Sequence, residues 1–341
     1  MKKLAIVSLL ALSAVTSMAA DSVSLYGIID GGISATKAAG ASSATTSFTS
    51  GGMTTSAFGI KGNEDLGGGL SAFFDVSSFI DLGDGAVKGG ATQQNLFTRS
   101  AYVGVKDNTL GAVRAGRQEA PSFLPTILFN AYGDSSTYRP LWHATYFGGN
   151  NPPSTAIYND TGWDSAVSYT TPTIAGLNVT AIGSHNTTNG GTNSGGNALY
   201  FNGPFAATAY YQRTEINSQG SFQTNLYTTA KPGDAYGLGG SYDAGVAKVF
   251  ATYGEAKDNS QTMKSKTSQV STAIPAGKGS VLAEYATTKY YNNSDVTYAE
   301  AVVGYDLPLS KKTDVYANYG QFKETSLTNG VIYGAGLRVR F

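Results

Sequence analysis

The feature that most restricts this chain is a strict alternation of side chains at its C-terminal end. The residues at every second position are apolar, and those between them are glycine or arginine: Tyr333, Ala335, Leu337, Val339 and Phe341 against Gly334, Gly336, Arg338 and Arg340. Successive side chains of a β-strand point to opposite faces. The alternation therefore predicts a strand with an apolar environment on one side and a polar one on the other. The same pattern recurs in residues 70–77 and 314–320, and it predicts an all-β fold.

The N-terminal segment has the three parts of a secretory signal peptide. Lys2 and Lys3 precede an apolar run from Leu4 to Val15, and Ser17–Ala19 supplies small residues for cleavage. The apolar run is shorter than the ~20 residues that a membrane-spanning helix requires. We therefore expect residues 1–19 to direct export, and residues 20–341 to form the mature domain.

The charge content excludes several classes of protein. Only 13% of the residues are charged, about half of the ~25% usual for soluble domains. The 23 basic residues are matched by 23 acidic ones, so the chain lacks the positive excess that a nucleic-acid partner would require.

The chain has no cysteine, which excludes disulfides and thiolate ligands. After the leader no apolar segment is long enough for a membrane helix.

The spacing of the connections predicts how many strands there are. Seven short turns rich in Gly, Pro, Asn and Asp alternate with eight longer polar segments. The short turns are Leu66–Gly69, Asp107–Leu110, Thr171–Ala175, Asn202–Pro204, Asp243–Gly245, Pro275–Gly279 and Leu307–Lys312; the long segments are 36–55, 81–95, 118–163, 186–197, 216–233, 257–266, 291–297 and 324–329. Fifteen connections predict sixteen antiparallel strands, and Ser22–Ile33 should pair with Gly330–Phe341 to close the sheet. An even strand number with short turns at one rim and long loops at the other is typical of an outer-membrane β-barrel. Such a closed sheet pairs every backbone group inside the bilayer.

Several sequence blocks, in order along the chain, resemble the general trimeric porins of Gram-negative outer membranes. The blocks are Leu25-Tyr26-Gly27, residues 58–67, residues 97–104, Gly116-Arg117-Gln118, residues 235–239 and the terminal Phe341. The resemblance runs from about residue 20 to residue 341. It implies a homotrimer of sixteen-stranded barrels, each with its third loop folded into the pore, and it gives the C-terminal Phe341 a place in barrel closure.

The connection from Gln118 to Trp163 is the candidate for this constriction loop. It is the longest connection, and it holds half of the prolines, both tryptophans and His143. Loops of this length that contain many stiff residues are usually functional; the alternative is a rigid external cap.

The resemblance also implies a basic wall facing the loop. By motif match we expect Lys61, Arg99 and Arg117 on that wall, with Arg114 leaning to the opposite face. The acids available on the loop side are Glu119 and Asp134.

Two departures from the family pattern weaken the expected field across the pore. Ala57 stands where the family usually has Arg, and Pro121-Ser122-Phe123-Leu124 lacks the usual acid of the loop. A local excess of fixed positive charge favours anions, so we expect a mild anion preference. If lumen acids such as Glu64, Glu284 and Glu300 dominate instead, the preference should be for cations.

Nothing in the sequence indicates catalysis, a metal or a cofactor. The two histidines, His143 and His185, have no Gly-x-Ser-x-Gly motif beside them. We expect a passive diffusion channel for ions and small hydrophilic solutes, surrounded by outer-membrane lipid, with no nucleic-acid partner. The alternative is a binding protein, either a substrate-specific channel or an adhesin-like barrel. For the former, Tyr26, Tyr210, Tyr298 and Tyr316 could form an aromatic track in the lumen.

Overall fold

The computed structural model describes residues 21–88, 96–138, 140–142, 161–185, 191–215, 233–259, 264–291 and 295–341. The expected leader, residues 1–19, lies outside these ranges, as does His143. No helix among the described residues has the length and apolar character to cross a membrane.

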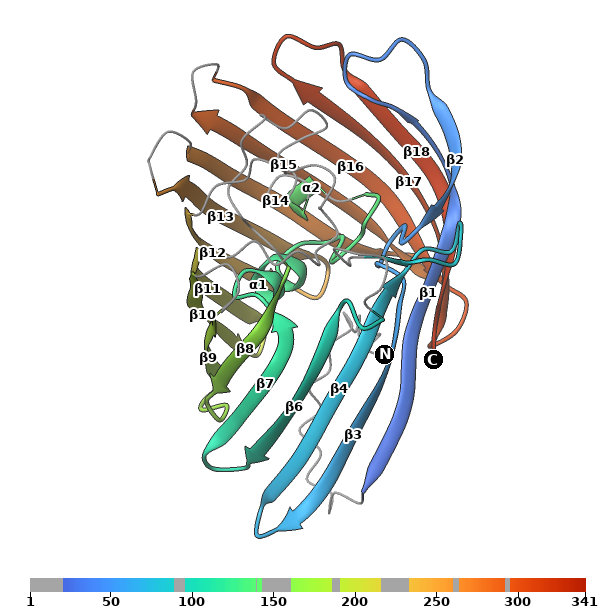
Figure 1. The fold of residues 1–341 in the computed structure, drawn as a ribbon. Coiled ribbons are helices and arrows are strands. Elements are labelled where there is room, and N and C mark those ends of the chain that lie inside the picture. The colour runs from blue at the N-terminus through green and yellow to red at the C-terminus, as the bar shows by residue number, and fades with distance from the viewer. Residues whose placement is uncertain are drawn as a thin grey trace.

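The described residues form one closed antiparallel β-barrel (Figure 1). Its wall contains sixteen strands: β1 (Ser22–Lys37), β3 (Ala57–Gly67), β4 (Leu70–Ile80), β6 (Ser100–Asp107), β7 (Gly111–Glu119), β8 (Gly162–Thr170), β9 (Leu177–His185), β10 (Thr192–Asn202), β11 (Phe205–Thr214), β12 (Gly233–Asp243), β13 (Lys248–Asp258), β14 (Lys264–Ala276), β15 (Gly279–Tyr291), β16 (Thr297–Pro308), β17 (Thr313–Glu324) and β18 (Gly330–Arg340). Two short strands, β2 (Thr45–Ser50) and β5 (Val87–Lys88), belong to the connections that follow β1 and β4. The predicted architecture is confirmed.

The first and last strands close the barrel, as expected, but in a shifted register. Ile28 pairs with Arg340 and Lys37 pairs with Val331, so β1 reaches beyond the predicted Ile33. The other edge of β1 pairs with β3 over residues 22–28 and with β2 over residues 31–36. On the side of β18 the pairing begins only at Ile28. Among the described strands, residues 22–26 therefore pair with β3 alone.

Phe341 completes this seam with its backbone and its ring. It exchanges both backbone hydrogen bonds with Gly27, at 3.1 and 3.2 Å. A Cβ atom at position 27 would lie 2.5 Å from Cζ of the Phe341 ring. Glycine is therefore needed at position 27 so that the last side chain can cover the seam.

The predicted short turns all join neighbouring strands, and they lie at one rim. One long segment is shorter than expected, because Thr192–Asn197 belongs to β10. These residues continue the ladder with β9 and β11. The polar composition that suggested a loop instead supplies side chains such as the buried Asn193 and Asn197.

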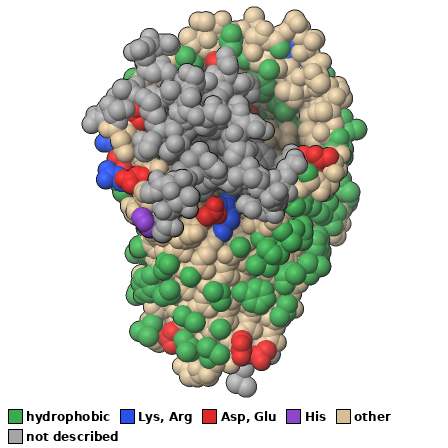
Figure 2. Space-filling model, in the orientation of Figure 1, with side chains coloured by type: hydrophobic (Ala, Val, Ile, Leu, Met, Phe, Trp, Pro, Cys, Tyr) green, Lys and Arg blue, Asp and Glu red, His purple; other side chains and the backbone are tan. Residues whose placement is uncertain are grey.

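The two faces of the wall differ as the alternation predicts. On β17 the side chains of Asp314, Tyr316 and Asn318 are buried inside the barrel, whereas Tyr319 is 43% exposed on the outside. Figure 2 shows apolar side chains spread over the outer strands in this view, with acidic side chains near the lower edge. The exposed apolar residues include Val23, Leu25, Ile33, Val103, Val105, Leu238, Val270 and Leu337. A surface of this kind is stable in contact with the hydrocarbon of a bilayer, but not in contact with water.

Candidate functional site

The described residues of the connection between β7 and β8, 120–138 and 140–142, lie against the inner surface of the wall. This connection contains α1 (Phe123–Leu128) and α2 (Pro140–Trp142), which Figure 1 shows inside the ring of strands. Side chains of five lumen-lining strands hold it: Asn197 Nδ2 donates to Pro121 O (3.0 Å), Gln212 Oε1 accepts from Ser122 N (3.1 Å), Ser271 Oγ from Ala131 N (3.0 Å), Glu284 Oε1 from Leu141 N (2.9 Å) and Asn318 Oδ1 from the Tyr132 hydroxyl (3.2 Å).

Residues 122–132 of this loop are joined by hydrogen bonds among themselves. The Thr126 hydroxyl donates to Ser122 O at 2.8 Å, and Asn130 Nδ2 donates to Thr126 O at 2.7 Å. Asn130 Oδ1 then accepts from Tyr132 N at 2.7 Å. Phe129, at the end of α1, is fully buried. The hydrogen bonds fix the shape of residues 122–132, and Phe129 adds a contact with the wall through the Phe201 ring.

A second inward segment, Gly51–Ser56, is anchored by Asp30. The Asp30 carboxylate is fully buried and accepts backbone N–H groups from Gly52 (3.2 Å), Met53 (2.7 Å) and Thr54 (2.8 Å). It also accepts the hydroxyl of Tyr316 at 2.5 Å. A Cβ atom at position 52 would lie 1.7 Å from the Tyr316 oxygen, so this close approach requires glycine.

This anchored segment supports the long loop in turn. The Thr55 hydroxyl donates to Asp134 O at 2.7 Å, and the Ser135 hydroxyl donates to Gly52 O at 2.5 Å. The Ser136 hydroxyl donates to Gly51 O at 2.9 Å. The loop is thus held by the far wall at one side and by the Asp30-anchored segment at the other. Sequence reasoning did not identify Asp30; the signal was a single acid within the otherwise uncharged strand Val23–Ile33.

Arg338, which the alternation puts on the polar side of the last strand, is buried in a charged network. Its guanidinium donates to Asp314 Oδ1 at 2.8 Å, to Asp306 Oδ2 at 2.9 Å and to the Thr54 hydroxyl at 2.7 Å. Arg340 also pairs with Asp314. The positive charges of this wall are therefore neutralised locally.

Lys61 and Arg99 lie along one side of the lumen, near Tyr26 and Phe79. Lys61 on β3 is exposed, and its ammonium lies 5.0 Å from the centre of the Tyr26 ring. Arg99 is in the bend before β6, with its guanidinium 5.7 Å from the centre of the Phe79 ring. Asp75 lies directly opposite Lys61 in the ladder and accepts the Tyr26 hydroxyl at 2.6 Å.

Asp134 is the loop acid that is coupled to Arg99. Burial raises the pKa of Asp134 to about 6, and the positive charge of Arg99 opposes this rise.

Arg114 and Arg117 occupy opposite faces of β7, and the register reverses the sides expected for them. Arg114 alternates with the outward Val113, and its guanidinium lies 5.3 Å from the ring centre of the lumen-side Tyr102. It is 3.6 Å from Glu119, so these two candidates pair with each other.

Arg117 lies opposite Ala101, on the same face as Val103. Its guanidinium is 2.6 Å from Asp164 and donates to Thr98 O at 2.6 Å. The sequence motif could not distinguish these two sides, because the alternation says only that they differ.

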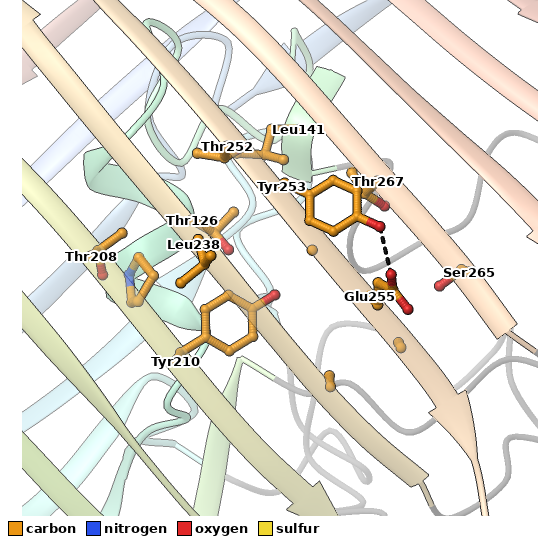
Figure 3. Close-up of a pocket in the computed structure, with 14 residues that line it drawn as sticks. Thr126, Leu141, Thr208, Tyr210, Leu238, Thr252, Tyr253, Glu255, Ser265 and Thr267 are labelled. Atoms are coloured by element: carbon orange, nitrogen blue, oxygen red, sulfur yellow. Dashed lines mark hydrogen bonds between the residues drawn. The ribbon is translucent and has the colours of Figure 1, made fainter.

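A pocket of about 40 Å³ lies between α1 and strands β11–β14 (Figure 3). Thr126 and Leu141 reach it from the loop, and Thr208, Tyr210 and Thr252 line it from the wall. A cavity of this size holds a few water molecules at most. This pocket is therefore too small to hold an organic solute.

Comparison with known proteins assigns this architecture. A family model described as Gram-negative porin matches residues 5–327. Outer membrane porin protein 32 of Delftia acidovorans is 27% identical over 324 residues, which cover 90% of this chain and 85% of that protein. An outer membrane porin protein of Bordetella pertussis is 29% identical over 287 residues, covering 75% of this chain and 70% of the relative.

Solved structures share the fold. An anion-selective porin from Comamonas acidovorans superimposes with a TM-score of 0.79 at 23% identity, covering 94% of this chain and 100% of that structure. OmpT of Vibrio cholerae, in a trimer form, gives a TM-score of 0.66 at 19% identity, covering 95% of this chain and 100% of that one.

Proposed function

This chain belongs to the Gram-negative porin family, whose members are outer-membrane channels for solute diffusion. From this we propose that it acts as a passive diffusion channel and that the β7–β8 loop narrows its pore. The observation that carries the proposal is the set of hydrogen bonds from the loop to lumen-facing side chains on five strands. A loop attached in this way reduces the open cross-section at its own height. Sixteen strands alone would enclose a wide aqueous channel.

The narrow section should prefer anions mildly. Lys61 and Arg99 supply positive charge on one wall, and Glu119, on the same wall near Tyr102, is paired with Arg114 at 3.6 Å. Asp134 is the remaining loop acid among the predicted residues, and burial raises its pKa to about 6. At physiological salt the Debye length is ~8 Å, so these nearby charges should outweigh distant ones. The structural similarity to a porin described as anion-selective supports the same sign.

The alternative is a channel specific for one class of solute, which would need an aromatic track. Three of the four tyrosine candidates have their hydroxyls bound to carboxylates: Tyr26 to Asp75, Tyr298 to Glu300 and Tyr316 to Asp30. Tyrosines used in this way support the wall rather than a sliding sugar. We therefore favour the non-specific channel.

The test is single-channel recording in a planar bilayer with a KCl gradient. A diffusion porin gives a steady ohmic conductance, a reversal potential on the anion side and no saturation by one solute. A conductance blocked by micromolar amounts of one sugar would support the specific channel. Absence of conductance from folded protein would support the adhesin-like alternative.

A further inference from the structure

The inward segment Gly51–Ser56 lies between the barrel wall and the β7–β8 loop, and it fits tightly against both. A Cβ atom at position 52 would overlap with the Tyr316 hydroxyl of the wall, and one at position 51 would overlap with the Ser136 hydroxyl of the loop. All residues of the segment except Thr54 are buried. The thickness of the segment therefore fixes the distance between the wall and the loop at this height.

An apolar cluster fills the same space. It joins Met53 of the segment to Tyr132 and Tyr138 of the loop and to Tyr316 of the wall, and each of these four side chains is at most 4% exposed. Asn318 on β17 contacts both inward segments, because its Nδ2 lies 3.4 Å from Met53 Sδ and its Oδ1 accepts the Tyr132 hydroxyl at 3.2 Å. The side chain of Met53 is thus packed between the loop and the wall.

One residue of β1, Asp30, holds nearly the whole segment. Its backbone binds both ends: Asp30 O accepts from Gly51 N at 2.7 Å, and Asp30 N donates to the Ser56 hydroxyl oxygen at 3.0 Å. Its carboxylate accepts the N–H groups of residues 52–54. Of the six residues in the segment, Thr55 is the one that binds the loop instead.

The segment passes this anchorage on to loop residues 134–136. Thr55 donates to Asp134 O through its backbone N–H (3.3 Å) and its hydroxyl (2.7 Å). Ser136 donates to Gly51 O in the same two ways, at 3.0 and 2.9 Å. The position of this part of the loop therefore depends on Asp30, whereas α1 and α2 are held by the opposite wall.

We propose that Asp30 is a positioning residue of the channel, which sets the size limit of the pore by fixing Gly51–Ser56 as a spacer between the wall and the loop. The inference rests on the proposed function, in which the loop is the constriction, and adds the residue that controls the width. Without the Asp30 carboxylate, residues 134–136 open locally while the barrel stays folded. A solute almost as wide as the pore passes mainly through the widest states of the loop, so discrimination by size weakens.

The test is the uptake of neutral sugars by liposomes that contain the folded barrel. Asp30→Asn replaces an acceptor oxygen with an amide donor that cannot bind N–H groups, and Tyr316→Phe is the milder change. The matched control is Tyr298→Phe, because this buried tyrosine donates at 2.7 Å to Glu300 on its own strand. We expect the uptake rate of a tetrasaccharide relative to a pentose to at least double in Asp30→Asn, to rise in Tyr316→Phe and to be unchanged in the control. An unchanged ratio in both anchor variants, or an equal rise in the control, overturns the proposal.

A second measurement reports the loop without depending on transport. The chain has no cysteine, so Thr137→Cys places a single thiol at a half-buried position beside residues 134–136. Its reaction with a water-soluble maleimide should become severalfold faster when Asp30→Asn is added, and should not change when Tyr298→Phe is added. Equal rates with and without Asp30→Asn would overturn the positioning role even if the parent channel conducts. A parent that shows no size-dependent uptake would instead refute the proposed function, and the thiol rates would still decide the role of Asp30.

Discussion

The hydroxyl of Tyr316 on β17 donates to the buried carboxylate of Asp30 on β1, across 286 positions of sequence, at 2.5 Å. The same carboxylate accepts three backbone N–H groups from the inward segment 51–56. One hydrogen bond thus joins the last strands of the barrel to the support of its pore loop.

Removing that hydroxyl should loosen the segment without removing the wall. Hydrogen bonds to charged groups contribute about 1.5–3 kcal/mol, so we expect Tyr316→Phe to lower the free energy of unfolding by that order. The measurement is urea unfolding in lipid vesicles, followed by tryptophan fluorescence. Tyr319→Phe, on the outer face of the same strand, is the control and should change stability by less than ~0.5 kcal/mol. Equal effects of the two changes would contradict the role assigned to Asp30.

Ion preference should depend on Arg99 and not on Arg117. Arg99→Gln removes a positive charge beside the pore loop, so the reversal potential in a KCl gradient should move toward the cation side. Arg117→Gln removes the same charge from the face that Ala101 and Val103 share, and it should leave the reversal potential unchanged. If Arg117→Gln shifts the reversal potential as much as Arg99→Gln does, Arg117 also faces the narrow section, and the assignment to Arg99 alone is wrong.

Acidification should strengthen the anion preference. The pKa of Asp134 is raised to about 6 by burial, so its carboxylate is mostly ionised at pH 7.5 and mostly neutral at pH 5. Losing this negative charge beside Arg99 increases the net positive charge of the narrow section. The ratio of anion to cation permeability should therefore rise as the pH falls through 6. The Asp134→Asn variant should show the acid-side ratio already at pH 7.5 and a smaller change between the two values.

A charged side chain on the lipid-facing surface should destabilise the barrel more, the deeper it lies in the bilayer. Leu238 lies at the middle of β12 and is 63% exposed, whereas Leu337 lies three residues before the end of β18 at the short-turn rim. Arginine on the outer face costs ~2–4 kcal/mol at the midplane and ~0–1 kcal/mol near an interface. Leu238→Arg should therefore lower the free energy of unfolding more than Leu337→Arg does. Equal losses in the same vesicle assay would contradict the depth assigned to these residues.

Three barrels should associate through the outer face of residues 22–117. This face carries exposed apolar side chains such as Val23, Leu25 and Ile33, and a trimer form is known for a protein with the same fold. Unheated detergent gels should show a band near three times the monomer mass that collapses on boiling. Ile33→Arg should weaken that band, whereas Val270→Arg, on the far side of the barrel, should not. A single monomer band in mild detergent would refute the assembly.

The fold was accessible from sequence because both of its signals are local. Alternation in residues 333–341 reports the two environments of a strand, and a turn such as Leu66–Gly69 reports a hairpin. The register was less accessible: the extension of β1 to Lys37 depends on pairing with residues about three hundred positions away. The polar stretch Thr192–Asn197 suggested a loop, because lumen-facing strand residues and loop residues share the same composition.

The site was predicted less completely, because it depends on which charges neutralise one another. Motif position indicated Lys61 and Arg99, but not that Arg114 would pair with Glu119 or that Arg338 would be buried between Asp306 and Asp314. Those pairings join strands whose contact is set by the whole barrel. Asp30 carried only a weak signal, as one acid in an uncharged strand, and its partners in residues 52–54 become visible only once the segment turns inward.

The seam formed by Gly27 and Phe341 also restricts the order of events in folding. Its two backbone hydrogen bonds join the first strand to the residue that follows the last one, so the sheet keeps two open edges until both ends of the barrel sequence are present together. Unpaired strand edges template aggregation, and contacts between distant residues form slowly. Before closure the chain must therefore be prevented from pairing with other copies of itself. The barrel closes only when Phe341 pairs with Gly27.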